Sequence, residues 1–319
     1  MKTITIRRLF LLVLTACLFL TACQPAAPAA TATPAPTATP AAIVLTDGLG
    51  RTVTLKQTAQ RIVSLAPSNT EILYAVGAGA QVVGRDDFSN FPAESDSLPT
   101  VGGSFGGYNQ EAIVNLKPDL VMAAEINTAE QVKALENLGL TVYYLSNPKD
   151  LDGMYQNLMT VATLTGHEKE TTIFIDTLKK RVEAATLKLT KVTSRPTVFY
   201  ELDATDPNAP YTAGPGTFLN LLIDMAGGKN IGAELGSSWA QLSVEQLIVA
   251  DPDFIILGDS NYGVTLEVVA ARAGWSSLKA VKNGQVYPFN DDLVSRPGPR
   301  LVDGLEALAA LIHPEVFKK

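Results

Sequence analysis

The stretch RIVSLAPSNTEILYAVGAG, residues 61–79, decides the fold because it combines one strand, one loop and one helix. A β-branched run is followed by a proline-bearing turn and then by an apolar helical pattern that closes on Ala-Gly. The same order returns in residues 197–228. Two such units predict two α/β lobes with mostly parallel central sheets. Open α/β sheets bind ligands at the carboxyl ends of their strands, so we expect a cleft between the lobes.

The first 22 residues have the layout of a secretory signal peptide. Basic residues precede an apolar run at 9–20, and small residues come directly before Cys23. The segment Leu20–Cys23 is similar to a bacterial lipobox, which makes Cys23 the expected lipidation site. Several acyl chains, at about 0.8 kcal/mol per buried methylene, hold a protein stably on a membrane. The alternative is an uncleaved anchor helix, for which the run is short.

Residues 23–42 are almost wholly Pro, Ala and Thr, a composition that favours extended conformers and builds no core. We interpret them as a tether. Loss of residues 1–22 removes three of the 25 basic residues and none of the 32 acidic ones, so the mature net charge is 22 − 32 = −10. The basic surface of a nucleic-acid-binding protein is therefore not expected.

A long helical pattern separates the two units. It runs from Glu168 to Leu189 and spans roughly 30 Å at 1.5 Å per residue, more than one small lobe requires, so we predict a rigid link. The sequence similarity between residues 118–122 and residues 252–257 supports an internal duplication. The predicted parts are an N-terminal lobe at 43–166, an interlobe helix at 167–192 and a C-terminal lobe at 193–319.

Catalytic and metal-binding side chains are scarce. The two cysteines, Cys17 and Cys23, belong to the N-terminal segment, and the chain has two histidines, His167 and His313. Disulfides and cysteine nucleophiles are thus excluded from the mature part. Two distant histidines also argue against a Ser-His-Asp triad and a His-rich metal site.

Particular residues support one enzymatic alternative. The pairs Asp86-Asp87 and Asp291-Asp292 supply carboxylates of the kind that cleave glycosidic bonds, so an extracytoplasmic carbohydrate-active hydrolase stays open. Adjacent aspartates in loops are more often solvated turn formers. We therefore favour a protein that binds a ligand without making or breaking a bond.

Aromatic and polar residues gather in the loops that should face the cleft. The loop at residues 85–107 is long, and its phenylalanines argue against disorder. Concave sites with apolar walls and a few polar groups bind bulky ligands. For each residue alone, the alternative role is packing in the hydrophobic core. The predicted ligand-binding residues are Phe88, Phe105, Tyr108, Tyr211, Trp239, Asp291, Asp292 and Arg296.

Two acidic residues occupy notable helix positions. Glu71 follows Ser68 by three residues, as in a capping box, and a carboxylate in the first turn suits the helix dipole. Asp224 falls in the last turn of the helix expected at 217–226. There it opposes the dipole by about 0.3–1 kcal/mol, and no local feature of the sequence explains it.

Four motifs carry a family resemblance: RIVSLAPSNTE at 61–71, NLKPDLV at 115–121, TAGPG at 212–216 and AGGKNI at 226–231. In this order they resemble the substrate-binding lipoproteins of ABC importers for cobalamin, haem and iron-siderophores. The likeness extends from Gln60 to about His313. It implies the class III periplasmic binding protein architecture, in which one long helix joins two α/β lobes.

The resemblance also implies partners. The protein is expected to be a monomer without a cofactor of its own, which captures a metal chelate and delivers it to an ABC permease dimer with its ATPase. In the family, each lobe presents an acid to permease arginines. By position in the motifs, these acids resemble Glu71 and Asp224.

Within the family, the Gly-Pro-Gly turn and Trp239 are closer to cobalamin binders. Phe105 stands where a tryptophan is expected in them, which is a departure. Haem binders usually offer a tyrosine or histidine to iron, and siderophore sites gather arginines. The candidates for these alternatives are Tyr108, Tyr211 and Tyr262 for haem, and Arg85, Arg296 and Arg300 for a siderophore.

Overall fold

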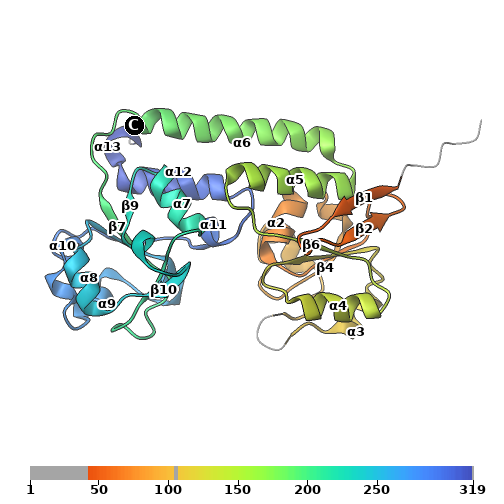
Figure 1. Ribbon diagram of the computed structural model, residues 1–319, viewed down its shortest axis with the longest axis horizontal. Helices are drawn as coiled ribbons and strands as arrows, with labels where there is room; N and C mark the ends of the chain where they lie inside the picture. The colour runs from red at the N-terminus through yellow and green to blue at the C-terminus, as the bar shows by residue number, and fades with distance from the viewer. Residues whose placement is uncertain (1–41, 104–106, 318–319) are drawn as a thin grey trace, which may run out of the picture. The chain divides into compact units, whose positions relative to one another are not determined.

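Two central sheets, each of four parallel strands, form the frame of the structure, a computed structural model that describes residues 42–103 and 107–317 (Figure 1). Parallel strands are covered on both faces, which explains why they read as continuous apolar runs. The N-terminal sheet has the order β4-β3-β5-β6, with β3 (Ile62–Ser64), β4 (Val82–Arg85), β5 (Leu120–Ala124) and β6 (Val142–Leu145). The C-terminal sheet has the order β12-β11-β7-β9, with β7 (Thr197–Glu201), β9 (Lys229–Asn230), β11 (Phe254–Leu257) and β12 (Val286–Pro288). The predicted α/β fold with parallel sheets is confirmed.

We call the first sheet and its helices the N-terminal lobe, and the second sheet and its helices the C-terminal lobe. The N-terminal lobe contains α2 (Pro67–Ala75), α3 (Gln110–Asn115), α4 (Ala129–Asn137) and α5 (Leu151–Thr165). The C-terminal lobe contains α7 (Phe218–Met225), α8 (Val244–Ala250), α9 (Leu266–Ala271), α10 (Lys279–Lys282) and α11 (Asp292–Ser295). The remaining strands form an antiparallel hairpin, β1 (Ile43–Thr46) with β2 (Thr52–Leu55), and a separate antiparallel pair, β8 (Tyr211–Ala213) with β10 (Trp239–Gln241).

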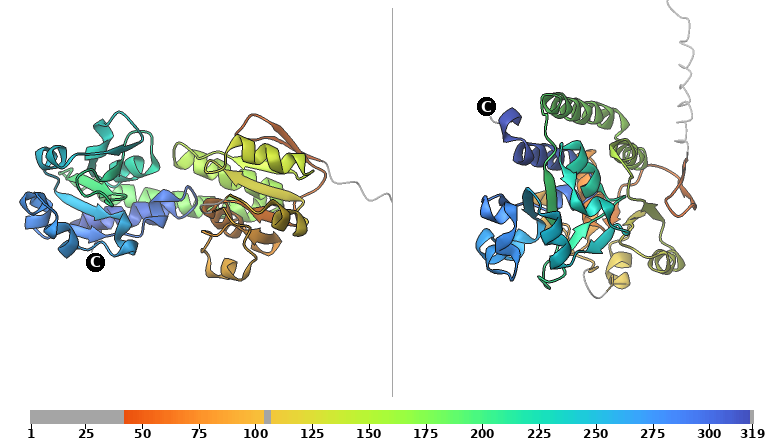
Figure 2. Two further views of the ribbon diagram at one scale, coloured as in Figure 1. Left: turned by 90° about the horizontal axis from the view of Figure 1, so that it is seen from below. Right: turned by 60° about the vertical axis from the view of Figure 1, so that its left-hand side comes forward.

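Helix α6 (Glu168–Leu189) has the predicted bounds and packs on both α5 and α12 (Leu301–Ile312), as Figures 1 and 2 show. The short α13 (Pro314–Phe317) follows α12. One hydrophobic cluster runs without interruption from Ile72 through Leu178 to Leu305. The lobes thus share a core built by several helices and are not joined by α6 alone. The exact lobe boundaries, and the rigidity of the link, stay predictions.

The internal duplication has a structural signature in two X-Pro-Asp turns, at residues 117–119 and 251–253. The residue before the proline is left-handed in both turns, with φ of 49° and 39°. In both turns the aspartate side chain accepts a hydrogen bond from the backbone N–H of the neighbouring strand start, Arg61 at 3.0 Å and Thr197 at 2.8 Å. Helix α3 leads into β5, and helix α8 into β11, through the same local construction.

A buried ion cluster ties α2 to the segment that precedes α12. Glu71 is 2% exposed, and Arg300 binds both of its carboxylate oxygens, at 2.8 and 2.5 Å. Arg296 adds a third contact at 3.1 Å. The Arg300 guanidinium also lies over the ring of Phe91, 4.0 Å from its centre, in a cation–π contact. The cluster joins residues that are more than 200 positions apart in the sequence.

The capping-box prediction for Ser68 and Glu71 is wrong. Helix α2 begins at Pro67, its N-cap is Ala66, and no side chain caps it. Proline at the first helical position starts the helix earlier than expected because its missing N–H would be unpaired there anyway. Glu71 therefore lies beyond the first turn, and its carboxylate binds arginines instead of the helix end.

Several predictions fall on residues outside the described ranges: the signal peptide, Cys23, the tether and Phe105. Within residues 42–103 and 107–317, no helix is long and apolar enough to cross a membrane.

We predict that Glu71→Ala lowers the free energy of unfolding by about 3 kcal/mol, because it leaves two mostly buried guanidinium groups without their partner. Urea denaturation measures this loss. The matched control is Arg181→Ala on α6, which removes ion pairs to Asp303 and Glu306 whose members are each more than a third exposed. Such exposed pairs contribute less than about 1 kcal/mol. Equal losses in the two variants would contradict a stabilising role of the buried cluster.

Candidate functional site

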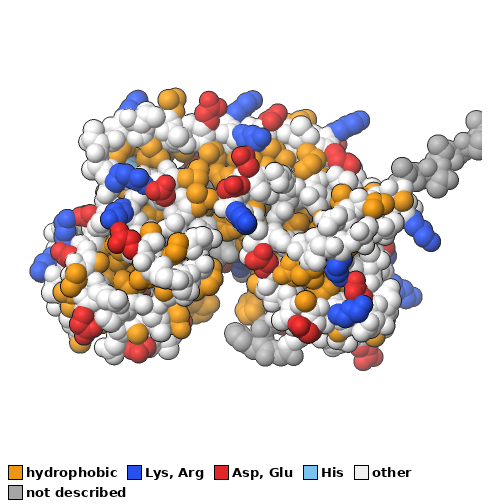
Figure 3. Space-filling model, viewed as in Figure 1, with side chains coloured by type: hydrophobic (Ala, Val, Ile, Leu, Met, Phe, Trp, Pro, Cys, Tyr) orange, Lys and Arg blue, Asp and Glu red, His pale blue; other side chains and the backbone are white. Residues whose placement is uncertain are grey.

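Two pockets lie at the carboxyl ends of the parallel strands, where ligands of open α/β sheets bind. The N-terminal pocket has a volume of about 460 Å³, and the C-terminal pocket about 620 Å³. Figure 3 shows the surface hollowed between the two lobes on this side. Residues that line the N-terminal pocket include Phe88, Ala124, Ile126, Asn147 and Arg296. Residues that line the C-terminal pocket include Asp203, Gly258, Asp259, Tyr262, Asp291 and Asp292.

Phe88 and Tyr108 have different roles in the N-terminal lobe. Phe88 lines the pocket and is 46% exposed, as expected for a residue that contacts a ligand. The Tyr108 hydroxyl donates to the carbonyl of Leu65 at 2.7 Å and accepts from the Asn127 amide at 2.5 Å. Burial raises the pKa of Tyr108 to about 12. Its phenol is therefore committed to the fold and poorly suited to bind iron.

Tyr211 and Trp239 are brought together by the antiparallel β8–β10 pair, which was not expected from the sequence. Tyr211 pairs with Gln241, and Trp239 with Ala213, so both aromatic residues point to the same face of the pair. They are 44% and 57% exposed. This strand pair therefore presents two aromatic side chains to solvent, while Thr212 on its other face is buried.

The segment after β12 brings the predicted Asp291, Asp292 and Arg296 together, but mainly as partners of protein groups. Asp291 accepts a hydrogen bond from the Tyr200 hydroxyl at 2.9 Å, and burial raises its pKa. Asp292 binds Arg296 at 2.9 Å. Arg296 also donates to Asn90 at 2.8 Å, in addition to its contact with Glu71. A ligand at this segment would meet a preformed network.

The geometry gives the hydrolase alternative no support. Asp86 is 2% exposed and accepts hydrogen bonds from the backbone N–H groups of Phe88 and Ser89 and from the Ser89 hydroxyl. It belongs to the N-terminal lobe, whereas Asp291 belongs to the C-terminal lobe and is held by Tyr200. Arg85, a candidate for siderophore binding, is likewise buried and bonds to backbone carbonyls of residues 86, 95 and 96.

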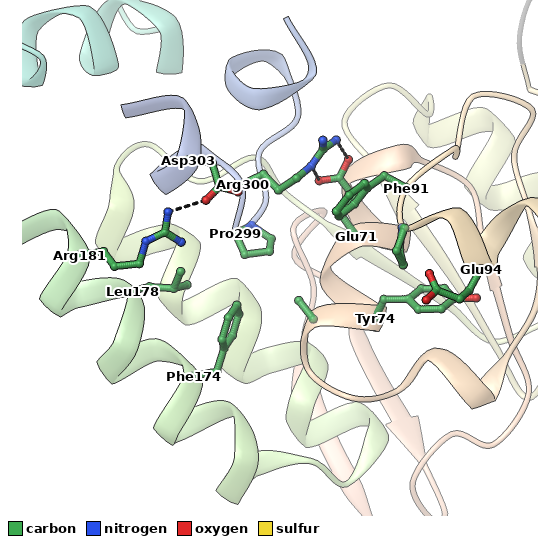
Figure 4. A pocket seen from close by; sticks show the side chains of 12 residues that line it. Glu71, Tyr74, Phe91, Glu94, Phe174, Leu178, Arg181, Pro299, Arg300 and Asp303 are labelled. Carbon is green, nitrogen blue, oxygen red and sulfur yellow. Dashed lines mark hydrogen bonds and ion pairs between the residues drawn. The ribbon is translucent and has the colours of Figure 1, made fainter. Parts of the chain in front are cut away.

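A third pocket, about 450 Å³, lies against α6 on the other side of the ion cluster (Figure 4). Tyr74, Phe91, Phe174 and Leu178 give it apolar walls. Glu71 and Arg300 line this pocket, whereas Arg296 lines the N-terminal pocket. The ion cluster therefore forms a partition between the two cavities.

The two predicted docking acids both bind arginines of the protein itself. Glu71 is buried in the ion cluster and presents no carboxylate to the surface. Asp224 is exposed, but its side chain binds Arg195 at 2.5 Å, and Arg195 also binds the carbonyl of Gly228. These contacts hold Asp224 beside the amino ends of β7 and β9, away from the cleft, and they supply the local partner that the sequence did not reveal.

A buried charged group in the C-terminal lobe was missed. Glu201, the last residue of β7, is fully buried, and Arg272 binds both of its oxygens at 2.6 and 2.9 Å. Asp259, two residues after β11, is also buried, and burial raises the pKa of both carboxyls, that of Glu201 to about 7. A charged residue at the end of an apolar strand was the signal in the sequence.

No metal site is preformed in the part of the chain that the structure describes, since no three acidic, histidine or cysteine side chains converge there as metal ligands. The arrangement is suited to hold a bulky ligand between aromatic and polar walls.

We predict that Glu201 makes the protein less stable as the pH rises from about 5 to 7.5. The pKa of Glu201 is about 7 in the folded protein, compared with its ordinary value of 4.5. Between these two pH values the folded state therefore binds more protons than the unfolded state. The free energy of unfolding then falls with rising pH. Glu201→Gln should weaken this dependence, whatever it costs in overall stability. Urea denaturation at pH 5 and pH 7.5 tests it, and parallel pH profiles of variant and wild type would contradict it.

Comparisons with known proteins agree with this geometry. Residues 62–293 match the family model described as "Periplasmic binding protein". A relative in Bacillus subtilis strain 168, an uncharacterized ABC transporter substrate-binding lipoprotein called YvrC, is 34% identical over 282 residues, which cover 87% of each chain.

Two solved structures share the fold. The periplasmic vitamin B12 binding protein BtuF of Vibrio cholerae is 28% identical with a TM-score of 0.69, and the match covers 82% of this chain and 99% of that one. The periplasmic heme-binding protein RhuT of Roseiflexus sp. RS-1, in apo form, is 26% identical with a TM-score of 0.73, covering 81% and 99%. The chain therefore belongs to the periplasmic binding protein family.

Proposed function

We propose that this extracytoplasmic protein captures cobalamin, or a related metal chelate, and delivers it to an ABC permease. One observation carries the proposal: two pockets lie at the carboxyl ends of both sheets, with the exposed Phe88 in the N-terminal pocket and two exposed aromatic side chains on the β8–β10 strand pair. Flat, bulky ligands bind such concave, partly apolar sites. The similarity to a lipoprotein and to a vitamin B12 binding protein supports the same role.

Haem is the second candidate. Tyr262 lines the C-terminal pocket and is 90% exposed, so its phenol is accessible to an iron centre. The similarity to a heme-binding protein supports this alternative. The aspartates that line the C-terminal pocket argue against haem, because they repel its carboxylates.

The lipid anchor and the monomeric state belong to the same proposal. The lipobox-like segment before Cys23 and the proline-rich residues 23–42 support a lipidated N-terminus with a tether. Such a tether would keep the binding protein near its permease and raise its effective concentration there.

The internal duplication suggests which acids dock on the permease. Glu111 lies eight residues before Asp119, and Glu245 lies eight residues before Asp253, in the first turns of α3 and α8. Both acids are exposed. Because α3 and α8 lead into the amino ends of β5 and β11, their first turns point toward the cleft side of each lobe. We propose that these two carboxylates, in place of Glu71 and Asp224, meet basic residues of the permease.

Trp239 provides the test of ligand binding. We predict that protein without residues 1–24 binds cyanocobalamin in calorimetric titration, and that Trp239→Ala weakens binding by about 10- to 100-fold, as expected for a buried aromatic contact. Val249→Ala is the control, because Val249 is 87% exposed at the end of α8 that leads into the amino end of β11, away from the carboxyl ends of the strands. Absence of cobalamin binding, together with tight binding of haem or a siderophore, would overturn the choice of ligand.

For docking, we predict that Glu111→Ala with Glu245→Ala leaves ligand affinity within about threefold of wild type and reduces stimulation of the transporter ATPase by at least tenfold. Loss of two interfacial charge contacts, at about 1.5 kcal/mol or more each, accounts for this effect. Asp224→Ala with Glu183→Ala, a matched removal of two exposed acids away from the cleft side, should change neither quantity. Unchanged stimulation in the first pair would refute the proposed docking acids.

A further inference from the structure

A turn at the carboxyl end of β5 places Ile126 in the N-terminal pocket. The turn comprises residues 124–127, and its backbone is closed by a hydrogen bond from the Asn127 N–H to the Ala124 carbonyl at 2.8 Å. Ile126 lines the pocket and is 63% exposed. A single exposed isoleucine is an ordinary feature of protein surfaces. Ile126 differs from such a residue in the support of its turn and in the pocket that it lines.

Asn127 holds the turn from its buried side. Asn127 is 3% exposed, and both polar atoms of its side chain have partners. Its Oδ1 atom accepts a hydrogen bond from the Ala124 N–H at 2.7 Å, and its Nδ2 atom donates to the Tyr108 hydroxyl at 2.5 Å. A buried polar network whose members are satisfied makes the surrounding structure rigid. The side chain of Ile126 therefore stands on a backbone that has little freedom to move.

Tyr108 connects this turn to a second wall of the pocket. Its hydroxyl donates to the carbonyl of Leu65 at 2.7 Å, directly before residues 66–68, which line the same pocket. Burial raises the pKa of Tyr108 to about 12, so the phenol stays protonated and keeps this donor at neutral pH. The Glu125 carboxylate adds another connection, because it accepts a hydrogen bond at 3.0 Å from the N–H of Asn147, which also lines the pocket. The turn is thus tied to two other walls of the cavity.

The N-terminal pocket offers little free charge to a ligand. Among the described residues that line it, Arg296 is the one with a charged side chain. Arg296 binds Glu71 at 3.1 Å and Asp292 at 2.9 Å, so its guanidinium already has two carboxylate partners. Phe88, which is 46% exposed, adds a second large apolar side chain to the pocket. Together, Phe88 and Ile126 suit an uncharged, apolar part of a ligand.

We propose that the turn at residues 124–127 is a preorganised apolar wall of the ligand site. Ile126 contacts an uncharged, aliphatic part of the ligand, and Asn127 and Tyr108 are positioning residues that act through Ile126. A wall that is rigid before binding loses little conformational freedom when the ligand arrives, and this raises the affinity. The inference rests on the proposed function and deepens it, because it assigns the apolar face of the ligand to the N-terminal lobe.

The first test changes Ile126 itself. Cyanocobalamin is a suitable probe because its corrin ring carries methyl groups at its edge. In calorimetric titration, Ile126→Ala should weaken its binding about fivefold or more, because most of an apolar contact is lost. Ile126→Leu keeps the volume and the apolar character, so its affinity should stay within about threefold of wild type. Leu138→Ala is the matched control and should leave the affinity unchanged, because Leu138 is 47% exposed at the C-cap of α4 and does not line the pocket.

The second test is a double-mutant cycle, which separates positioning from direct contact. Asn127→Ala should weaken cyanocobalamin binding about three- to tenfold in the wild-type background, but less than about twofold in protein that already carries Ile126→Ala, because residues that act as a unit are not additive. Urea denaturation reports the stability of each variant separately. Tyr108→Phe removes only the hydroxyl group, and it takes the place of Asn127→Ala in the cycle if that variant fails to fold.

The outcomes separate this inference from the proposed function. If cyanocobalamin binds, but Ile126→Ala weakens its binding by less than about fivefold or no more than Leu138→Ala does, the apolar wall is wrong while the proposed function stands. Equal losses of affinity in the two backgrounds of the cycle would overturn the positioning role of Asn127 and Tyr108. If the wild-type protein binds no cyanocobalamin, both the inference and the proposed ligand are wrong.

Discussion

Glu71 and the two arginines that bind it determine how the segment before α12 lies against α2. This segment also carries Asp291 and Asp292, so the same ion cluster positions one wall of both cleft pockets. Removing charges from water is costly, and a buried cluster of this kind is stable only where its geometry satisfies every partner. The position of the cleft walls therefore depends on a contact between residues that are far apart in the sequence.

The duplicated architecture places equivalent parts on both lobes, but the pockets differ in chemistry. The N-terminal pocket is lined by apolar and small residues around Phe88, and the C-terminal pocket by aspartates over the buried Glu201–Arg272 pair. Such a division suits a ligand that offers a broad apolar surface together with hydrogen-bond donors at its edge. The common scaffold thus explains the position of the site, and the residues that differ between the lobes explain its selectivity.

The sequence predicted the features that depend on local patterns. The bounds of α6 were predicted correctly because a long, periodic apolar pattern specifies a helix. Contacts across the fold were not predictable in this way: Glu71 and Arg300 are 229 residues apart in the sequence, and Asp224 and Arg195 are 29 residues apart. The β8–β10 pair was missed because each strand has three residues and because α7 and β9 lie between them in the sequence. Glu201 at the end of an apolar strand was the one visible sign of the buried pair.

A crystal structure of the protein with cyanocobalamin tests the central claim most directly, since it locates the ligand relative to both sheets. We predict a corrin at the carboxyl ends of the strands, in contact with Phe88 and Trp239. The Glu71–Arg300 pair should remain intact beside it. A corrin bound instead in the pocket against α6, next to Phe174, would contradict the account.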